Sequence, residues 1–189
     1  MLELNDPRWA DLSHCYGSGE NIPPFLQKIA DTDELGSEFW DELTNILCHQ
    51  CSTGSASASA FCHLVKLAGQ KSDLKTGFDS LCLAALILAY ELGPENNIER
   101  LWESTEYFDA YPEYLRQPVL DAIENGKRVV EQLLYNKKLD YAQMMRVLGV
   151  AGVFGGFSEM YLLLPQLGSK TVYCVNCDDD LKTDTLFPY

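Results

Sequence analysis

The chain has 189 residues, of which 47% are hydrophobic and 11% aromatic, enough to fold around one core. Its formal net charge of −14 disfavours nucleic acid and anionic membranes as direct partners, because both are bound through lysine and arginine. No secretory signal is found, and the apolar stretch at residues 81–90 is too short to span a bilayer. We therefore expect a cytoplasmic protein.

Helical signals dominate the chain. Asp6 followed by Pro7 predicts a capped helix start, and Ser37 and Asp140 are the expected N-caps of two further helices. Small residues at 55–60 open another helix and should let it approach its neighbours closely. The expected helices lie at residues 8–15, 23–30, 38–50, 56–69, 77–93, 95–108, 111–126, 127–136, 140–152 and 158–168.

Only the end of the chain has the composition of extended structure. Residues 170–177 and 183–189 favour strands, and a hairpin through residues 176–182 is plausible. The sequence therefore predicts an all-α fold of HEAT-like antiparallel helical hairpins, either an α-solenoid or a compact bundle, with a small extended C-terminal tail or hairpin. We expect one helical domain at residues 1–168, with residues 169–189 packed on it as the tail.

The cysteines first suggest a metal or redox site, because Cys48 with Cys51 and Cys174 with Cys177 form two C-x-x-C pairs. The two pairs are far apart in sequence, and Cys48 lies in an apolar helical pattern where a buried thiol is the commoner role. A thioredoxin-like pair would require a βαβ context that is absent. Seven cysteines without a secretory signal favour a reducing compartment, and no metal or cofactor is expected.

Nucleophilic catalysis has little support. Cys62 and His63 are adjacent, so on a helix their side chains point about 100° apart and do not face each other. A dyad of Cys51 with His63 remains open, although nothing specific favours it. We predict no catalytic residue, and we expect the chain not to be an enzyme.

An acidic run interleaved with aromatic residues is the main candidate for function. Glu91, Glu95, Glu99 and Glu103 recur every four residues, an unfavourable arrangement on a helix unless a partner uses it. Carboxylates beside aromatic side chains suit a protein interface, although a solvated helix face with its aromatics in the core is an equal alternative. The predicted partner-binding residues are Glu95, Glu99, Trp102, Glu103, Glu106, Tyr107, Asp109 and Tyr111.

Two further acidic clusters are present. No basic residue lies between Lys28 and Lys66, a stretch that holds Asp31, Asp33, Glu34, Glu38, Asp41 and Glu42. The other cluster is the run at residues 178–180. Such a charge distribution would accelerate association with a basic partner.

The segment FWDELTNILCHQCSTGSASASAFCHLVKLA, residues 39–68, resembles part of the HEAT-like helical immunity proteins of bacterial contact-dependent growth inhibition and polymorphic-toxin systems. In that family a helix containing tryptophan ends in a His-Gln-Gly turn, and a helix start of small residues follows. The matching residues are Trp40, Leu43, His49, Gln50, Ser55, Ala56, Ser57, Ala60, His63 and Leu64. YCVNCDDDL is similar to a Cys-Pro-x-Cys-Gly tail found in some relatives.

The sequence departs from that pattern at Cys51, where glycine is usual, at Cys62, where proline is usual, and at Asp178, which replaces the glycine of the tail. The resemblance implies a non-enzymatic immunity protein that binds a cognate protein toxin. The toxin would be basic, for instance a nuclease, and an acidic surface would occlude its active site or substrate cleft.

Two alternatives remain open, namely a general helical-repeat scaffold for protein–protein interaction and a zinc-binding or cysteine-dependent enzyme. The segment around residues 51–55 is predicted to be the turn of a helical hairpin. At this turn we expect His49 and Gln50 to form structural hydrogen bonds.

Overall fold

The computed structural model describes residues 1–49, 53–71, 74–93, 95–104, 110–135, 139–158, 160, 171–174 and 179–182. Its helices are α1 Ile22–Asp31, α2 Ser37–Leu47, α3 Ser55–Gln70, α4 Leu74–Leu92, α5 Arg116–Leu134 and α6 Tyr141–Phe154. Short 3₁₀ helices are η1 Pro7–Asp11, η2 Gly19–Asn21, η3 Ile98–Trp102 and η4 Glu113–Leu115. The strands are β1 Ser13–His14, β2 Gly17–Ser18, β3 Thr171–Cys174 and β4 Asp179–Lys182. The predicted all-α class is confirmed.

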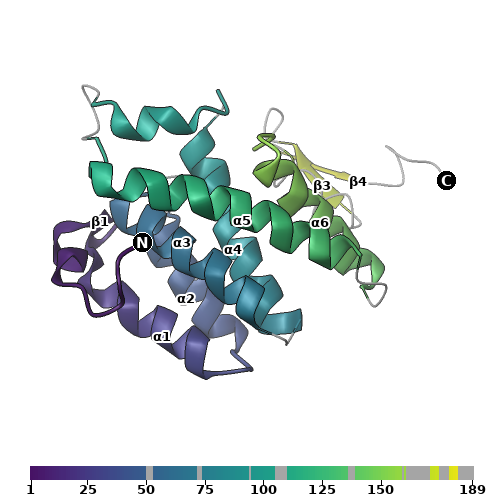
Figure 1. The fold of residues 1–189 in the computed structure, drawn as a ribbon. Coiled ribbons are helices and arrows are strands. Elements are labelled where there is room, and N and C mark those ends of the chain that lie inside the picture. Colours follow the sequence, from purple (N-terminus) through teal and green to yellow (C-terminus); the bar gives the residue numbers. More distant parts are fainter. Residues whose placement is uncertain are drawn as a thin grey trace.

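The helices stack in two layers (Figure 1). Helix α1 packs on α3 and α3 packs on α5, while α2 packs on α4 and α4 packs on α6. Within this stack α3 packs against α4, and α5 against α6, because short connections return each helix along its predecessor. Successive pairs that contact their neighbours in this way are the arrangement predicted for stacked helical hairpins.

Helix α3 is the centre of the core. Every residue from 55 to 65 is buried, and the serines and alanines at its start provide little side-chain volume. The backbones of α1, β1, α4 and α5 can therefore pack around this one helix, as the small residues predicted. Phe61 fills the space toward α6, where its ring stacks on Phe154 with centroids 6.1 Å apart.

The corner between α2 and α3 is closed by Ser57. Its hydroxyl donates to the carbonyl of Leu47 at 2.7 Å, which satisfies the last turn of α2, and accepts from the amide of Gly54 at 3.3 Å. The N-cap of α2 is Gly36, one residue before the predicted Ser37, and it forms no side-chain cap. The residues predicted to bond this turn were His49 and Gln50. Gln50 lies outside the described residues, and His49 bonds Tyr16 and Asn45 instead of Ser57 or Gly54 in the bonds described.

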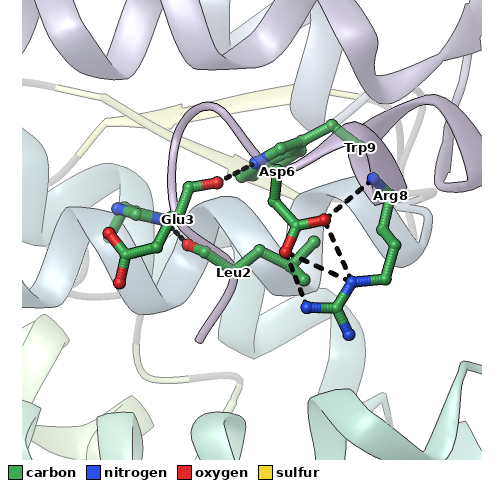
Figure 2. Close-up of polar contacts among 6 residues, drawn as sticks. Leu2, Glu3, Asp6, Arg8 and Trp9 are labelled. Carbon is green, nitrogen blue, oxygen red and sulfur yellow. Dashed lines mark hydrogen bonds and ion pairs between the residues drawn. The ribbon is translucent and has the colours of Figure 1, made fainter.

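The N-terminal segment differs from the predicted helix at residues 8–15. Asp6 is the predicted cap, since its carboxylate accepts from the Arg8 amide at 2.9 Å, but the helix is a 3₁₀ helix that ends at Asp11. Figure 2 shows Arg8 folded onto Asp6, and Trp9 donating from Nε1 to the Glu3 carbonyl at 3.0 Å. An antiparallel β1–β2 hairpin then replaces the rest of the predicted helix.

This N-terminal segment is fixed to the core. His63 Nε2 lies 2.8 Å from the Leu2 carbonyl oxygen, and a carbonyl can only accept, so Nε2 carries the ring proton. Burial lowers the pKa of His63, which keeps the ring neutral. Trp9, only 2% exposed, packs beside it.

Two predicted helices, at residues 111–126 and 127–136, are one helix in the structure. Helix α5 passes through Gly126 without a break, since glycine there serves packing instead of ending the helix. A Cβ at this position would overlap the ring of Phe154 on α6, with Cζ only 2.5 Å away. The predicted helix at 158–168 lies mostly outside the described residues.

Near the C-terminus, β3 pairs antiparallel with β4, in the register Thr171 with Lys182 and Cys174 with Asp179. A hairpin was predicted here, but its second strand comes earlier than the expected extended segment at 183–189. The packing of the tail on the helical domain remains a prediction.

Candidate partner-binding surface

The predicted acidic run at residues 91–103 does not form one helical stripe. Helix α4 ends at Leu92, Gly93 has φ +61° and Asn96 has φ +50°, and η3 follows in place of the expected helix at 95–108. A four-residue repeat aligns side chains only on a continuous α-helix, so the repulsion argument made from the sequence was wrong here. Of the predicted partner-binding residues, Glu106, Tyr107 and Asp109 lie outside the described part of the chain.

Arg100, the cation within this run, caps the end of α4. Its Nε donates to the Glu91 carbonyl and its Nη2 to the Tyr90 carbonyl, each at 2.8 Å. These are carbonyls of the last helical turn, where a positive charge also complements the helix dipole. Glycine is favoured at position 93 because its φ of +61° would strain any other residue, and a Cβ there would also lie 2.6 Å from the guanidinium carbon of Arg100.

Glu91 is buried instead of exposed, with 4% of its surface accessible. The Tyr111 hydroxyl donates to its carboxylate at 3.1 Å, and the Thr53 hydroxyl is a second partner. Burial raises the pKa of Glu91 to about 7, although these hydrogen bonds and the charge of Arg100 oppose the rise. Glu91, at the end of α4, therefore connects Thr53 before α3 to Tyr111 before η4. This is a structural role.

Arg116 neutralises part of the remaining acidic run. Its guanidinium forms ion pairs with Glu99 and Glu113 and lies over the Trp102 ring, 5.2 Å from the centroid. Trp102 and Tyr111 are half-buried against the core. These two side chains therefore fit the alternative stated above, in which the carboxylates are solvated and the aromatic residues pack inward. Glu95, Glu99 and Glu103 remain exposed.

The second acidic cluster is fully on the surface. All of its carboxylate residues are exposed, at positions 31, 33, 34, 38, 41 and 42. Lys71 and Lys75 form ion pairs with Asp33 and Glu34 at its α1 end. No described basic residue forms an ion pair with Glu38, Asp41 or Glu42, which we call the α2 face.

The α2 face has like charges at helical spacing. Glu38 and Glu42 are four residues apart on α2, a true α-helix, and such a pair costs about 0.2–0.5 kcal/mol. The like-charge repulsion expected for Glu91–Glu103 therefore occurs between Glu38 and Glu42 instead. The α2 face is therefore a better candidate for binding a basic partner than the acidic run at residues 91–103.

The β1–β2 hairpin stands beside the α2 face. Tyr16, between the two strands, lies with its hydroxyl 2.7 Å from His49 Nδ1 and donates to Asn45 Oδ1 at 3.3 Å. His49 Nδ1 also lies 2.8 Å from Asn45 Oδ1. The described bonds of His49 thus connect α2 to the hairpin, a contact the sequence pattern did not predict.

Three of the described cysteines, Cys48, Cys62 and Cys82, are poor nucleophiles. Burial raises the pKa of the Cys48 thiol, and raises the pKa of Cys62 and of Cys82 to about 12. Cys62 also donates to the Ala58 carbonyl at 3.4 Å. No group of three or more His, Cys, Asp or Glu residues able to hold a metal ion occurs within the described ranges, which exclude Cys51 and Cys177.

Alkylation measures this protection. Brief iodoacetamide treatment of the native protein at pH 8 should leave Cys48 and Cys62 unmodified, and denaturation in urea should expose both. Peptide-resolved mass spectrometry would report each site separately. Rapid labelling of Cys62 in the folded state would contradict its assignment as a buried core thiol.

Comparison with known proteins identifies no relative: no family model, no curated protein and no solved structure matches the chain. Among the described helices, none combines the length and the apolar character needed to cross a bilayer. Function is therefore argued from the surface chemistry.

Proposed function

We propose that this chain is an immunity-type protein that binds and neutralises a basic partner protein, a cognate toxin, through its acidic surface. The α2 face carries the proposal, because it exposes carboxylates without described ion-pair partners on a rigid helix. The resemblance of residues 39–68 to HEAT-like immunity proteins supports the same function. The net charge of −14 further favours a basic partner.

The mechanism we propose is occlusion. Nucleases and other proteins that act on anionic substrates line their clefts with lysine and arginine. A helix that presents Glu38, Asp41 and Glu42 could place carboxylates where such a cleft receives phosphate. Long-range attraction between opposite charges would speed the encounter and make association dependent on salt.

Co-purification tests this function. The chain should form a 1:1 complex with the product of the reading frame directly upstream, and should rescue cells that express it. Affinity should fall as salt is raised from 50 to 500 mM, values chosen to span the screening range. Absence of both the complex and the rescue would overturn the proposal.

Charge reversal tests which surface is used. Changing Glu38, Asp41 and Glu42 to lysine should weaken the complex about thirtyfold, or about 2 kcal/mol, because contacts to basic side chains become repulsive. The matched variant reverses the charges of Glu95, Glu99 and Glu103, which were predicted from the sequence to bind the partner. It should weaken the complex less than the first variant does. Binding measured by calorimetry that neither triple variant changes would favour a general helical scaffold.

A further inference from the structure

A surface pocket of about 480 Å³ lies between the N-terminal hairpin and α2. It combines β1, the hairpin turn, β2 and η2 on one side with the exposed side of α2 on the other. The residues that line it are His14, Tyr16, Ser18, Glu20, Asn21, Glu42, Asn45 and Ile46. Its walls come from segments more than 20 positions apart, so the pocket exists only in the folded chain.

The charges in this pocket have one sign. Glu20 and Glu42 contribute carboxylates from opposite walls, and no lysine or arginine is among the lining residues. Neither carboxylate forms an ion pair with a described basic residue. Glu42 is also part of the α2 face, so the pocket continues the surface to which we assign partner binding.

The pocket walls are held in place before any ligand arrives. His14, 9% exposed, accepts at Nδ1 from the Tyr16 amide at 3.1 Å, so its proton is on Nε2, which donates to Asn21 Oδ1 at 3.0 Å. Below the hairpin, the Ser55 hydroxyl accepts from the Ser13 amide at 3.1 Å. A wall fixed in this way loses little entropy when a partner binds.

Tyr16 adds an aromatic surface. Its side chain is 56% exposed, although the contacts to His49 and Asn45 hold its hydroxyl. An exposed ring in a fixed position is typical of interface anchors, and its face attracts cations. An aromatic face beside two carboxylates matches a planar cation, the guanidinium group, which donates to carboxylates and stacks on rings.

We infer that this pocket binds an arginine side chain of the basic partner protein. The inference rests on the proposed function, because it names the group of the partner that the acidic surface recognises. Glu20 and Glu42 pair with the guanidinium, and the Tyr16 ring stacks on it. The pocket is thus a specific contact within an otherwise diffuse electrostatic surface.

The experiment is an NMR titration of the full chain with N-acetyl-arginine amide, a probe that requires no partner protein. The side-chain amide signals of Asn21 and Asn45 and the ring signals of His14 should shift with saturation in the millimolar range, as expected for one small cation. The uncharged isostere N-acetyl-citrulline amide should leave these signals unchanged.

Two double variants separate the pocket from general acidity. Glu20→Gln with Glu42→Gln should weaken binding of the arginine probe about tenfold, which corresponds to two exposed ion pairs. Glu38→Gln with Asp41→Asn removes the same charge from α2 outside the pocket lining and should change the affinity less than twofold. Equal losses in the two variants, equal shifts with citrulline, or no shift at the pocket would overturn the inference.

This titration is independent of the toxin experiment. A chain that binds the arginine probe but neither captures the upstream gene product nor rescues cells that express it would overturn the proposed function and leave the pocket assignment standing. A chain that captures the product but shows no shifts at Asn21 and Asn45 in the arginine titration would overturn the pocket assignment and leave the proposed function standing.

Discussion

Replacing Glu91 with glutamine should stabilise the folded chain at pH 8 relative to wild type, and the benefit should vanish in acid. The pKa of Glu91 is raised from 4.5 to about 7 in the folded state. Between these values the folded state keeps a proton that the unfolded state loses, so stability falls as pH rises from 4.5 to 7. The stability difference between variant and wild type should grow by about 3 kcal/mol across this window.

Urea unfolding of both proteins at a series of pH values from 4.5 to 8 measures the effect. Only the difference between them is used, since other groups such as His63 titrate in both. Glutamine still accepts the Tyr111 hydroxyl hydrogen bond, so the comparison isolates the buried charge. Glu95→Gln, at an exposed position just beyond α4, is the control. The difference in unfolding free energy between this variant and wild type should not change with pH. A stability difference between Glu91→Gln and wild type that is also independent of pH would mean that the Glu91 carboxyl is not desolvated.

Alanine at Gly54 should destabilise the fold by about 3 kcal/mol, at the upper end of the cost of overpacking. Gly54 is the N-cap of α3, and the backbone of Ser13 and His14 in β1 lies against it. A Cβ would overlap the Ser13 carbonyl oxygen and lie 3.2 Å from the His14 Cα. Neither is the flexible end of a side chain, so the whole hairpin would have to move.

Gly36→Ala is the matched control for this prediction. Gly36 is also a glycine N-cap without a side-chain hydrogen bond, but a Cβ there has nothing within 4 Å. Thermal unfolding should show a large drop in Tm for Gly54→Ala and little change for Gly36→Ala. Comparable Tm values for the two variants would show that the hairpin does not pack closely on α3.

The helices could be predicted where apolar residues recur at helical spacing and a cap begins the pattern. Helix α6 is the clearest case, because Asp140 and Gln143 form the reciprocal bonds of a capping box. The close approach of neighbouring elements to the small residues that open α3 was also predicted. These features depend on local sequence, which patterns describe well.

The candidate site could not be predicted in the same way. Glu91 and Glu95 look equivalent in sequence, yet Gly93 separates a buried carboxyl from an exposed one. The strands β1 and β2 have two residues each and lack β-branched side chains, so no strand pattern exists. The hairpin forms through long-range contacts, such as that between Tyr16 and His49. The sequence signal that was available was Gly17, the first residue of β2, which adopts φ +143° directly after Tyr16.

The crowding around α3 also restricts which residues its first two turns can accept. Residues 55–60 are serine and alanine, and all six are buried. Because these positions are buried, a larger side chain there would have to displace packed neighbours, so selection for foldability alone would retain small residues. Evolutionary invariance of this segment would therefore reflect steric constraint. Variation between relatives in the hairpin and α2 would be the better indicator of a change in partner.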